Sequence, residues 1–339
     1  MKRTCRQGWV LAGMILWAGL AAAQTPAPVA PNPFDPVTAS MQLLATPAAR
    51  AAALGLLSQA GQNYLFGQQG APDMTLSVSL QSSGGLRLEG TGTMTEIWAG
   101  GRRTWQADFD GASSGIPYGL TSNPVPLRIA QTRTALLWPL LPLPAREEIL
   151  AANATVQGAP ATCVLVNHSR RPPPARGRDW HEAEYCMNAS GQLLLDSPAP
   201  GYYFLYDYAQ PVQYAGHMLA SSIRIIEGQQ TVVRIQITRF GPPSQDDLEM
   251  LQQSPRRRGI LTVHNEEVRF HPPQPPPEGE AGILLFTVGP AGNVLASEIV
   301  PNGDPDFEQQ VLTLLGRRRF RPRRVEQLIL LRATWPRPN

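Results

Sequence analysis

The sequence predicts an α+β protein: an antiparallel, β-rich N-terminal domain, half-barrel-like and with packing helices, followed by a small C-terminal unit of strand, strand, helix and strand. Two observations lead to this class. Apolar and polar residues alternate over many short segments, and turn residues rather than helices separate most of them. A few segments instead place apolar residues three or four positions apart, which is typical of helices.

A secretory signal is predicted at the start of the chain. Lys2 and Arg3 precede an apolar stretch over residues 9–20, and small residues end at Ala23. This order is typical of a signal peptide, so we expect residues 1–23 to direct export. The alternative is an uncleaved signal that anchors the chain in the inner membrane. Both readings place the bulk of the protein in the periplasm.

A Pro-rich spacer, residues 24–37, leads into the predicted β-rich domain, residues 38–245. Thr46 and Pro47 suit the cap and first position of a helix that continues to about Ala60. Alternation of apolar and polar residues then predicts strands at 74–81, 86–98, 105–109, 162–166, 183–187, 193–195, 202–206, 222–226 and 233–238.

An apolar cluster lies at residues 135–143 of this domain. Pro139 and Pro142 interrupt it, and it is too short to span a bilayer. We expect a buried loop or helix that packs on the sheet.

Two cysteines, Cys163 and Cys186, remain after removal of a signal that contains Cys5. An even pair in an oxidising compartment favours a disulfide. The alternative is two free thiols, because sequence alone does not place the two Cα atoms close together.

A connector with a Pro-rich linker, residues 246–280, joins the β-rich domain to the C-terminal unit, and Ser244 suits the cap of a short helix at its start. The C-terminal unit covers residues 281–339. It contains two predicted strands joined by a turn at Gly292, then a helix from Asp304, and a last strand from Val325.

The C-terminal unit resembles the C-terminal domain of TonB, the energy transducer of the Gram-negative envelope. The resemblance covers residues 281–335 and depends on the turn at Gly292 and on Phe320 and Pro322 before the last strand. It implies that an outer-membrane receptor docks an extended peptide by strand addition at the sheet edge. The edge implied is the last strand, with Val325, Leu328, Leu330 and Arg332. The alternative is an ordinary edge that charged residues protect.

Residues 38–240 resemble, on less specific features, the lipoprotein carriers typified by LolA. Those features are the export signal, a helix ahead of a strand meander, and aromatic strands around Trp98 and Trp105. The resemblance implies a concave face that binds lipid or another hydrophobic ligand. The alternative is that the same side chains only fill a core.

The sequence contains none of the enzyme motifs sought, including the Gly-x-Ser-x-Gly elbow, the His-Glu-x-x-His zinc motif and a phosphate-binding loop. We therefore expect no catalytic residues, no metal and no cofactor. A formal charge of +3 argues against a nucleic-acid partner. The leading prediction is a non-enzymatic envelope protein of TonB-type transport that docks a peptide. The second is a periplasmic carrier or scaffold for a hydrophobic ligand, and the third is a hydrolase with an unrecognised site.

Overall fold

The structure is a computed structural model of the 339-residue chain. It describes residues 42–43, 46–64, 66, 71–83, 88–113, 125–140, 148–167, 180–228, 230–254, 262–269, 282–300, 320–322 and 327–334. All of these residues belong to one compact unit, Pro33–Asn339. The predicted signal, spacer and Pro-rich linker lie outside the described residues.

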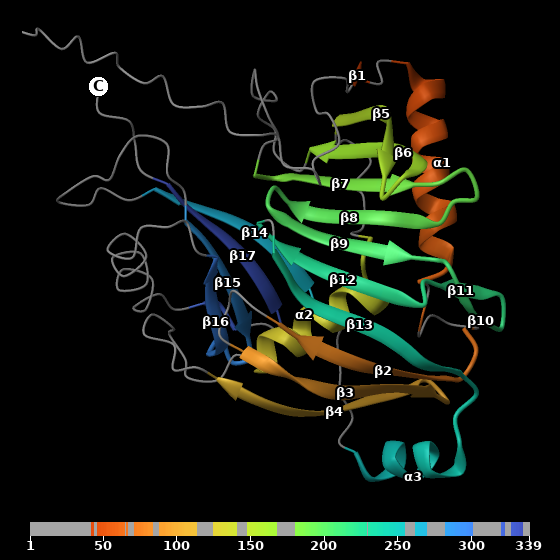
Figure 1. Ribbon diagram of the computed structural model, residues 1–339, viewed down its shortest axis with the longest axis vertical. Coiled ribbons are helices and arrows are strands. Elements are labelled where there is room, and N and C mark those ends of the chain that lie inside the picture. The colour runs from red at the N-terminus through yellow and green to blue at the C-terminus, as the bar shows by residue number, and fades with distance from the viewer. Residues whose placement is uncertain are drawn as a thin grey trace, which may run out of the picture. The chain divides into compact units, whose positions relative to one another are not determined.

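A large antiparallel sheet dominates the described part of the chain, in which eleven strands pair in the order β1-β5-β6-β7-β8-β9-β12-β13-β2-β3-β4 (Figure 1). The predicted antiparallel β-rich fold is therefore confirmed at this level. The strands are β1 Gln42–Leu43, β2 Met74–Ser82, β3 Leu88–Ala99, β4 Arg102–Ser113, β5 Glu148–Val156, β6 Ala159–Asn167, β7 Glu182–Met187, β8 Leu193–Ala199, β9 Tyr202–Asp207, β12 Ser222–Glu227 and β13 Gln230–Gly241. A separate hairpin pairs β10 Val212–Tyr214 with β11 His217–Leu219.

Alternation along β13 shows which face of this sheet two helices cover, and we call that face the inner face. The other face carries a smaller apolar cluster over β6–β9, which includes Tyr203 and Leu205. On β13, Val233, Ile235 and Ile237 are buried, whereas Arg234 and Gln236 between them are exposed. Successive side chains of a strand point to opposite faces, so the period of two that the sequence shows is the period of burial.

Two helices pack on the inner face: α1 Pro47–Gln62 and α2 Val125–Leu137. Figure 1 shows α1 running across the strands from β5 to β9. The expected helix from Pro47 is confirmed, and α2 ends two residues before Pro139, where a proline would remove a backbone donor. The expected burial of the apolar cluster is confirmed for Ala135 to Leu137. Within the described ranges, no helix is long and apolar enough to cross a membrane.

The helix α3, Gln245–Gln253, begins at the predicted cap. Ser244 Oγ accepts from the backbone N–H of Asp247, and an oxygen of Asp247 accepts from the backbone N–H of Ser244. This reciprocal pair satisfies donors that a helix start leaves without partners. Leu251 of α3 packs with Ile97 and Ala99 of β3.

A second sheet forms from four strands in the order β14-β17-β15-β16. They are β14 Thr262–Arg269, β15 Gly282–Val288, β16 Val294–Val300 and β17 Gln327–Thr334. The three predicted C-terminal strands are present, and the predicted helix from Asp304 lies outside the described residues.

The last strand, β17, is not an edge strand, which corrects the predicted docking edge. It pairs in parallel with β14 on one side and antiparallel with β15 on the other. Leu328, Leu330 and Arg332 therefore have strand partners on both sides, and Val325 lies outside the described residues. The reason is β14, which forms from residues within the predicted connector and occupies the position that a docked peptide would take.

Candidate functional site

The structure forms the predicted disulfide between Cys163 of β6 and Cys186 of β7. The two residues are direct partners in the antiparallel ladder, their Cα atoms are 3.9 Å apart, and both are fully buried. Adjacent strands thus bring together residues that are 23 positions apart in the sequence. The bond supports a protein that folds in an oxidising compartment.

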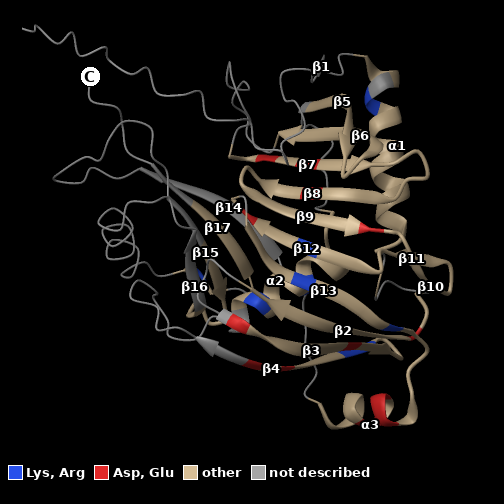
Figure 2. Ribbon diagram, in the orientation of Figure 1, with Lys and Arg blue, Asp and Glu red and all other residues tan. Residues whose placement is uncertain are grey.

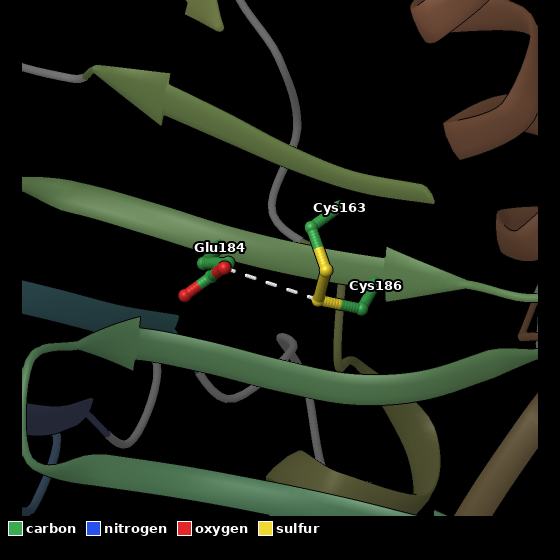
Figure 3. A group of neighbouring side chains, drawn as sticks. All are labelled: Cys163, Glu184 and Cys186. Atoms are coloured by element: carbon green, nitrogen blue, oxygen red, sulfur yellow. Dashed lines mark hydrogen bonds between the residues drawn. A yellow bond between two sulfur atoms is a disulfide. The ribbon is translucent and has the colours of Figure 1, made fainter. Parts of the chain in front are cut away.

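Glu184 completes a small group around this bond (Figure 3). Its Oε1 lies 3.9 Å from Sγ of Cys186. A carboxylate oxygen of Glu184 and the two sulfurs, which are the atoms that could bind a metal, all lie within 4.8 Å of one another. A disulfide sulfur carries no proton and is not a thiolate, whereas a metal ligand must be the thiolate. The oxidised group is therefore a structural cross-link.

Gly292, Phe320 and Pro322, the residues that carry the C-terminal resemblance, lie together. Gly292 has a φ of +81°, and a Cβ there would come within 2.4 Å of the carbonyl oxygen of Phe320 and 3.3 Å of the nitrogen of Pro322. The Phe320 ring packs on Phe286 with centroids 5.5 Å apart. Only glycine combines this conformation with so close a backbone approach, so the motif has a structural role in joining the turn to the segment before β17.

The helix α2 forms the centre of the candidate site on the inner face. Every residue from Leu127 to Leu137 is buried, although this stretch includes two arginines, a glutamine and two threonines. The helix also contacts β15, β16 and β17, and Leu285, Leu328 and Leu330 of those strands belong to the same buried cluster as the inner face. Contact with both sheets explains why the helix is buried on all sides.

The first ion pair of α2 joins Arg128 to Glu227 at the end of β12. The Arg128 guanidinium lies 3.2 Å from Oε1 of Glu227, and Gln131 donates to the same oxygen at 2.6 Å. Burial raises the pKa of Glu227 from its ordinary value, although the guanidinium of Arg128 and the amide of Gln131 both act to lower it. The charged form of Glu227 therefore depends on these two partners.

The second ion pair joins Arg133 to Glu96 of β3. Both side chains are almost inaccessible, with exposed fractions of 5% and 0%. The guanidinium also lies over two indole rings, 4.8 Å from the centroid of Trp105 and 5.3 Å from that of Trp138. Two aromatic faces and one carboxylate thus surround a single buried cation.

The inner face around α2 is strongly aromatic. Tyr202, Phe204 and Tyr206 of β9 are all nearly inaccessible, and the hydroxyl of Tyr206 donates to the backbone carbonyl of Ala135 at 3.0 Å. Burial raises the pKa of Tyr202 and of Tyr206 well above the ordinary tyrosine value, so both stay neutral. Beside the two ion pairs, the face that α2 covers is therefore aromatic and uncharged along β9.

The sequence predictions missed the two ion pairs of α2, and one signal in the sequence indicates the carboxylate of the second pair. Glu96 follows the inward-facing Met94 at a spacing of two and precedes the inward-facing Trp98. A carboxyl group buried at such a position needs a cation or hydrogen-bond donors if it is to be charged. The alternation thus identifies the carboxylate, whereas its partner on α2 depends on the tertiary fold.

No protein-family model and no curated protein matches the sequence. Among solved structures, the crystal structure of an outer membrane lipoprotein-sorting protein domain from Vibrio parahaemolyticus matches with a TM-score of 0.31 and 11% identity, covering 58% of this chain and 98% of that one. The sequence features of residues 38–240 resemble the same class of protein. A TM-score this low does not establish a shared fold, so the similarity by itself supports neither a family nor a function.

Proposed function

We propose that this chain is a non-enzymatic carrier of the bacterial envelope, which binds an apolar ligand such as the acyl chain of a lipid on the inner face of its large sheet. In this proposal α2 is an exchangeable cover. It lies on the face when the carrier is empty and yields that face to the ligand.

The observation that carries the proposal is the polar character of α2 over residues 127–137, all of which are buried. A helix that served only as core would bury apolar side chains, whereas α2 buries Arg128, Gln131 and Arg133. A buried ion pair gains attraction but costs the desolvation of both charges, and replacing such a pair with apolar residues is often neutral or stabilising. When α2 moves out, water solvates these groups again. The cover is therefore less firmly held than an apolar helix of the same length.

The face beneath α2 suits an apolar chain. It presents the aromatic side chains of β9 together with aliphatic residues of β12 and β13, namely Ile223, Ile225, Val233 and Ile235, all buried. Removing apolar surface from water contributes roughly 25 cal/mol per Å², so a ligand that replaced α2 would recover the burial that the face loses when α2 leaves.

The disulfide and the predicted signal of residues 1–23 support an exported, periplasmic setting for such a carrier. The second reading keeps the same location but makes the chain a scaffold whose inner face is only a core. Docking of a receptor peptide at the last strand is not proposed, because β17 already has two partners.

Binding of the fluorescent fatty acid cis-parinaric acid to the full chain tests the proposal. We expect saturable binding by the wild-type chain. The matched variant replaces the charges of both ion pairs with apolar residues, as Arg128→Met, Glu227→Met, Arg133→Met and Glu96→Met. We expect this variant to resist urea at least as well as the wild type, because its cover is held by apolar packing, and to bind the probe about tenfold more weakly, which corresponds to about 1.4 kcal/mol.

Two outcomes would contradict the carrier. The first is no saturable binding by the folded wild-type chain. The second is equal binding by the wild type and a folded apolar-cover variant, because the ligand would then not compete with α2. Arg321→Gln, a change of an exposed arginine, is the control and should leave probe binding unchanged.

A further inference from the structure

A groove of about 1040 Å³ crosses the other face of the large sheet, which we call the outer face. Its lining comes mainly from the central strands β9, β12, β13, β2, β3 and β4. This face is opposite to the one that α1 and α2 cover, because the lining residues alternate with the buried residues of the inner face. The groove is therefore independent of the proposed carrier site.

The strand register arranges the lining residues in two neighbouring rows that run across six strands. Residues that are partners in the ladder lie side by side on one face, so each row is a continuous line of side chains. The first row is Asp207, Ser222, Gln236, Ser79, Thr93 and Asp108. The second row runs from Leu205 through Arg224, Arg234, Gln81 and Thr91 to Asp110.

Two arginines, Arg224 of β12 and Arg234 of β13, are direct cross-strand partners in the second row. Figure 2 shows blue, the colour of lysine and arginine, on both β12 and β13. Like charges directly opposite each other destabilise a sheet. The Arg224 guanidinium donates to the neutral amide oxygen of Gln157 at 2.5 Å, and neither arginine forms an ion pair with another described residue.

Three carboxylates face the groove from its two ends. Asp207 lies on β9, where it accepts from the backbone N–H of Ala209 at 2.8 Å, and Asp108 and Asp110 lie on β4. Apart from Leu205 beside Arg224, the side chains in the two rows between these ends and the arginines are hydroxyls and amides. The groove thus has one positively charged place near its middle, polar groups along its length and acceptors at its rims.

From this arrangement we infer that the outer groove binds an anionic saccharide, a sugar that carries a phosphate or a carboxylate group. The two guanidinium groups provide N–H donors for the oxygens of one such group, and the negative charge of that group offsets the repulsion between the arginines. Serine, threonine and glutamine side chains pair with sugar hydroxyls as donors and acceptors, and the aspartates accept from hydroxyls. An anionic polymer with a charge on every unit would instead meet the rim carboxylates, so the arrangement favours a single charge among hydroxyls.

Isothermal titration of the full chain with glucose 6-phosphate, glucuronate, glucose and inorganic phosphate tests the inference. We expect one of the two charged sugars to bind and to lose affinity as salt is raised. Glucose should bind more weakly because it lacks the anion, and inorganic phosphate more weakly because it lacks the hydroxyls. Comparison of the two charged sugars distinguishes phosphate from carboxylate.

The variants Arg224→Gln and Arg234→Gln separate the site from general charge effects. We expect each to weaken the charged sugar by about tenfold or more, because each removes charge-assisted hydrogen bonds. Each should also raise the urea midpoint of the ligand-free protein, because repulsion across the strands is removed. Arg321→Gln removes one positive charge elsewhere and should change neither quantity.

Three results would overturn the inference. They are no binding of either charged sugar at millimolar concentration, equal affinity for inorganic phosphate and the charged sugar, and unchanged affinity in the folded double variant. Binding of cis-parinaric acid should be the same in the wild type and in the double variant. A failure of the groove is therefore distinguishable from a failure of the carrier.

Discussion

At the residue scale, Gly92 shows how closely β3 and β4 approach each other where no side chain separates them. A Cβ at Gly92 of β3 would lie 2.6 Å from the backbone oxygen of Asp108 and 2.7 Å from Cδ2 of Phe109 on β4. The Gly92→Ala variant must therefore shift the backbone of the neighbouring strand. We expect it to lower the free energy of unfolding by about 1–3 kcal/mol, as overpacked positions commonly do.

Gly55→Ala is the matched control for this prediction. Gly55 is exposed on α1, and a Cβ there meets no atom within 4 Å. Alanine should raise the free energy of unfolding by up to about 1 kcal/mol, because it favours the helix more than glycine does. Urea unfolding followed by circular dichroism measures both. If the Gly92→Ala variant unfolded at the wild-type urea midpoint, that result would contradict the close approach of the Asp108 backbone oxygen to position 92.

At the element scale, α3 depends on Asp247. This carboxylate accepts from the backbone N–H of Ser244 at 2.7 Å and from the hydroxyl of Thr75 at 3.0 Å, and it lies 3.0 Å from the guanidinium of Arg239. Partial burial alone would raise its pKa, but the hydrogen bonds from Ser244 and Thr75 and the charge of Arg239 outweigh burial and lower it. The folded protein therefore favours the charged form.

The Asp247→Asn variant tests this effect through its pH dependence. A lowered folded-state pKa stabilises the protein above the unfolded-state value, about 3.9 for aspartate, and the stabilisation is lost as pH falls through the folded-state pKa. We expect the variant to be less stable than the wild type by about 1–2 kcal/mol at pH 7, in the range of a helix cap. The difference should shrink below about pH 4. A difference that stayed constant from pH 7 to pH 3 would contradict the assigned charge.

Elements also differ in how far their sequences predict them. The strand β13 can be predicted from local alternation alone, because the face on which each residue lies depends only on its position in the strand. The helix α2 does not, because its arginines are typical of a solvated surface and become buried only through Glu96, Glu227 and contact with both sheets. Burial of a charge depends on a partner distant in the sequence.

At the scale of the whole molecule, the pairing of strands limits prediction in the same way. The sequence predicts the C-terminal strands, yet it predicts β17 at an edge, whereas β17 lies inside its sheet. Its parallel partner β14 begins 65 residues earlier, at Thr262 against Gln327. Nothing local in residues 262–269 selects that partner. The outer groove also depends on strand pairing. Its two rows of side chains form only when six strands, whose lining residues lie between positions 79 and 236, pair in the observed register.

The disulfide affects the stability of the whole chain, because it acts mainly by restricting the unfolded state. Closing a loop between residues 23 positions apart reduces the entropy of the unfolded chain, which contributes about 3 kcal/mol in the loop-entropy description. We expect the Cys163→Ala/Cys186→Ala variant to lose about that much free energy of unfolding in urea. The wild type treated with a reductant should approach the stability of this variant, and the variant itself should not respond to the reductant. Equal stability of oxidised wild type and variant would show that the bond contributes nothing to the fold, and that its role must be sought in the chemistry of the Cys163, Glu184 and Cys186 group.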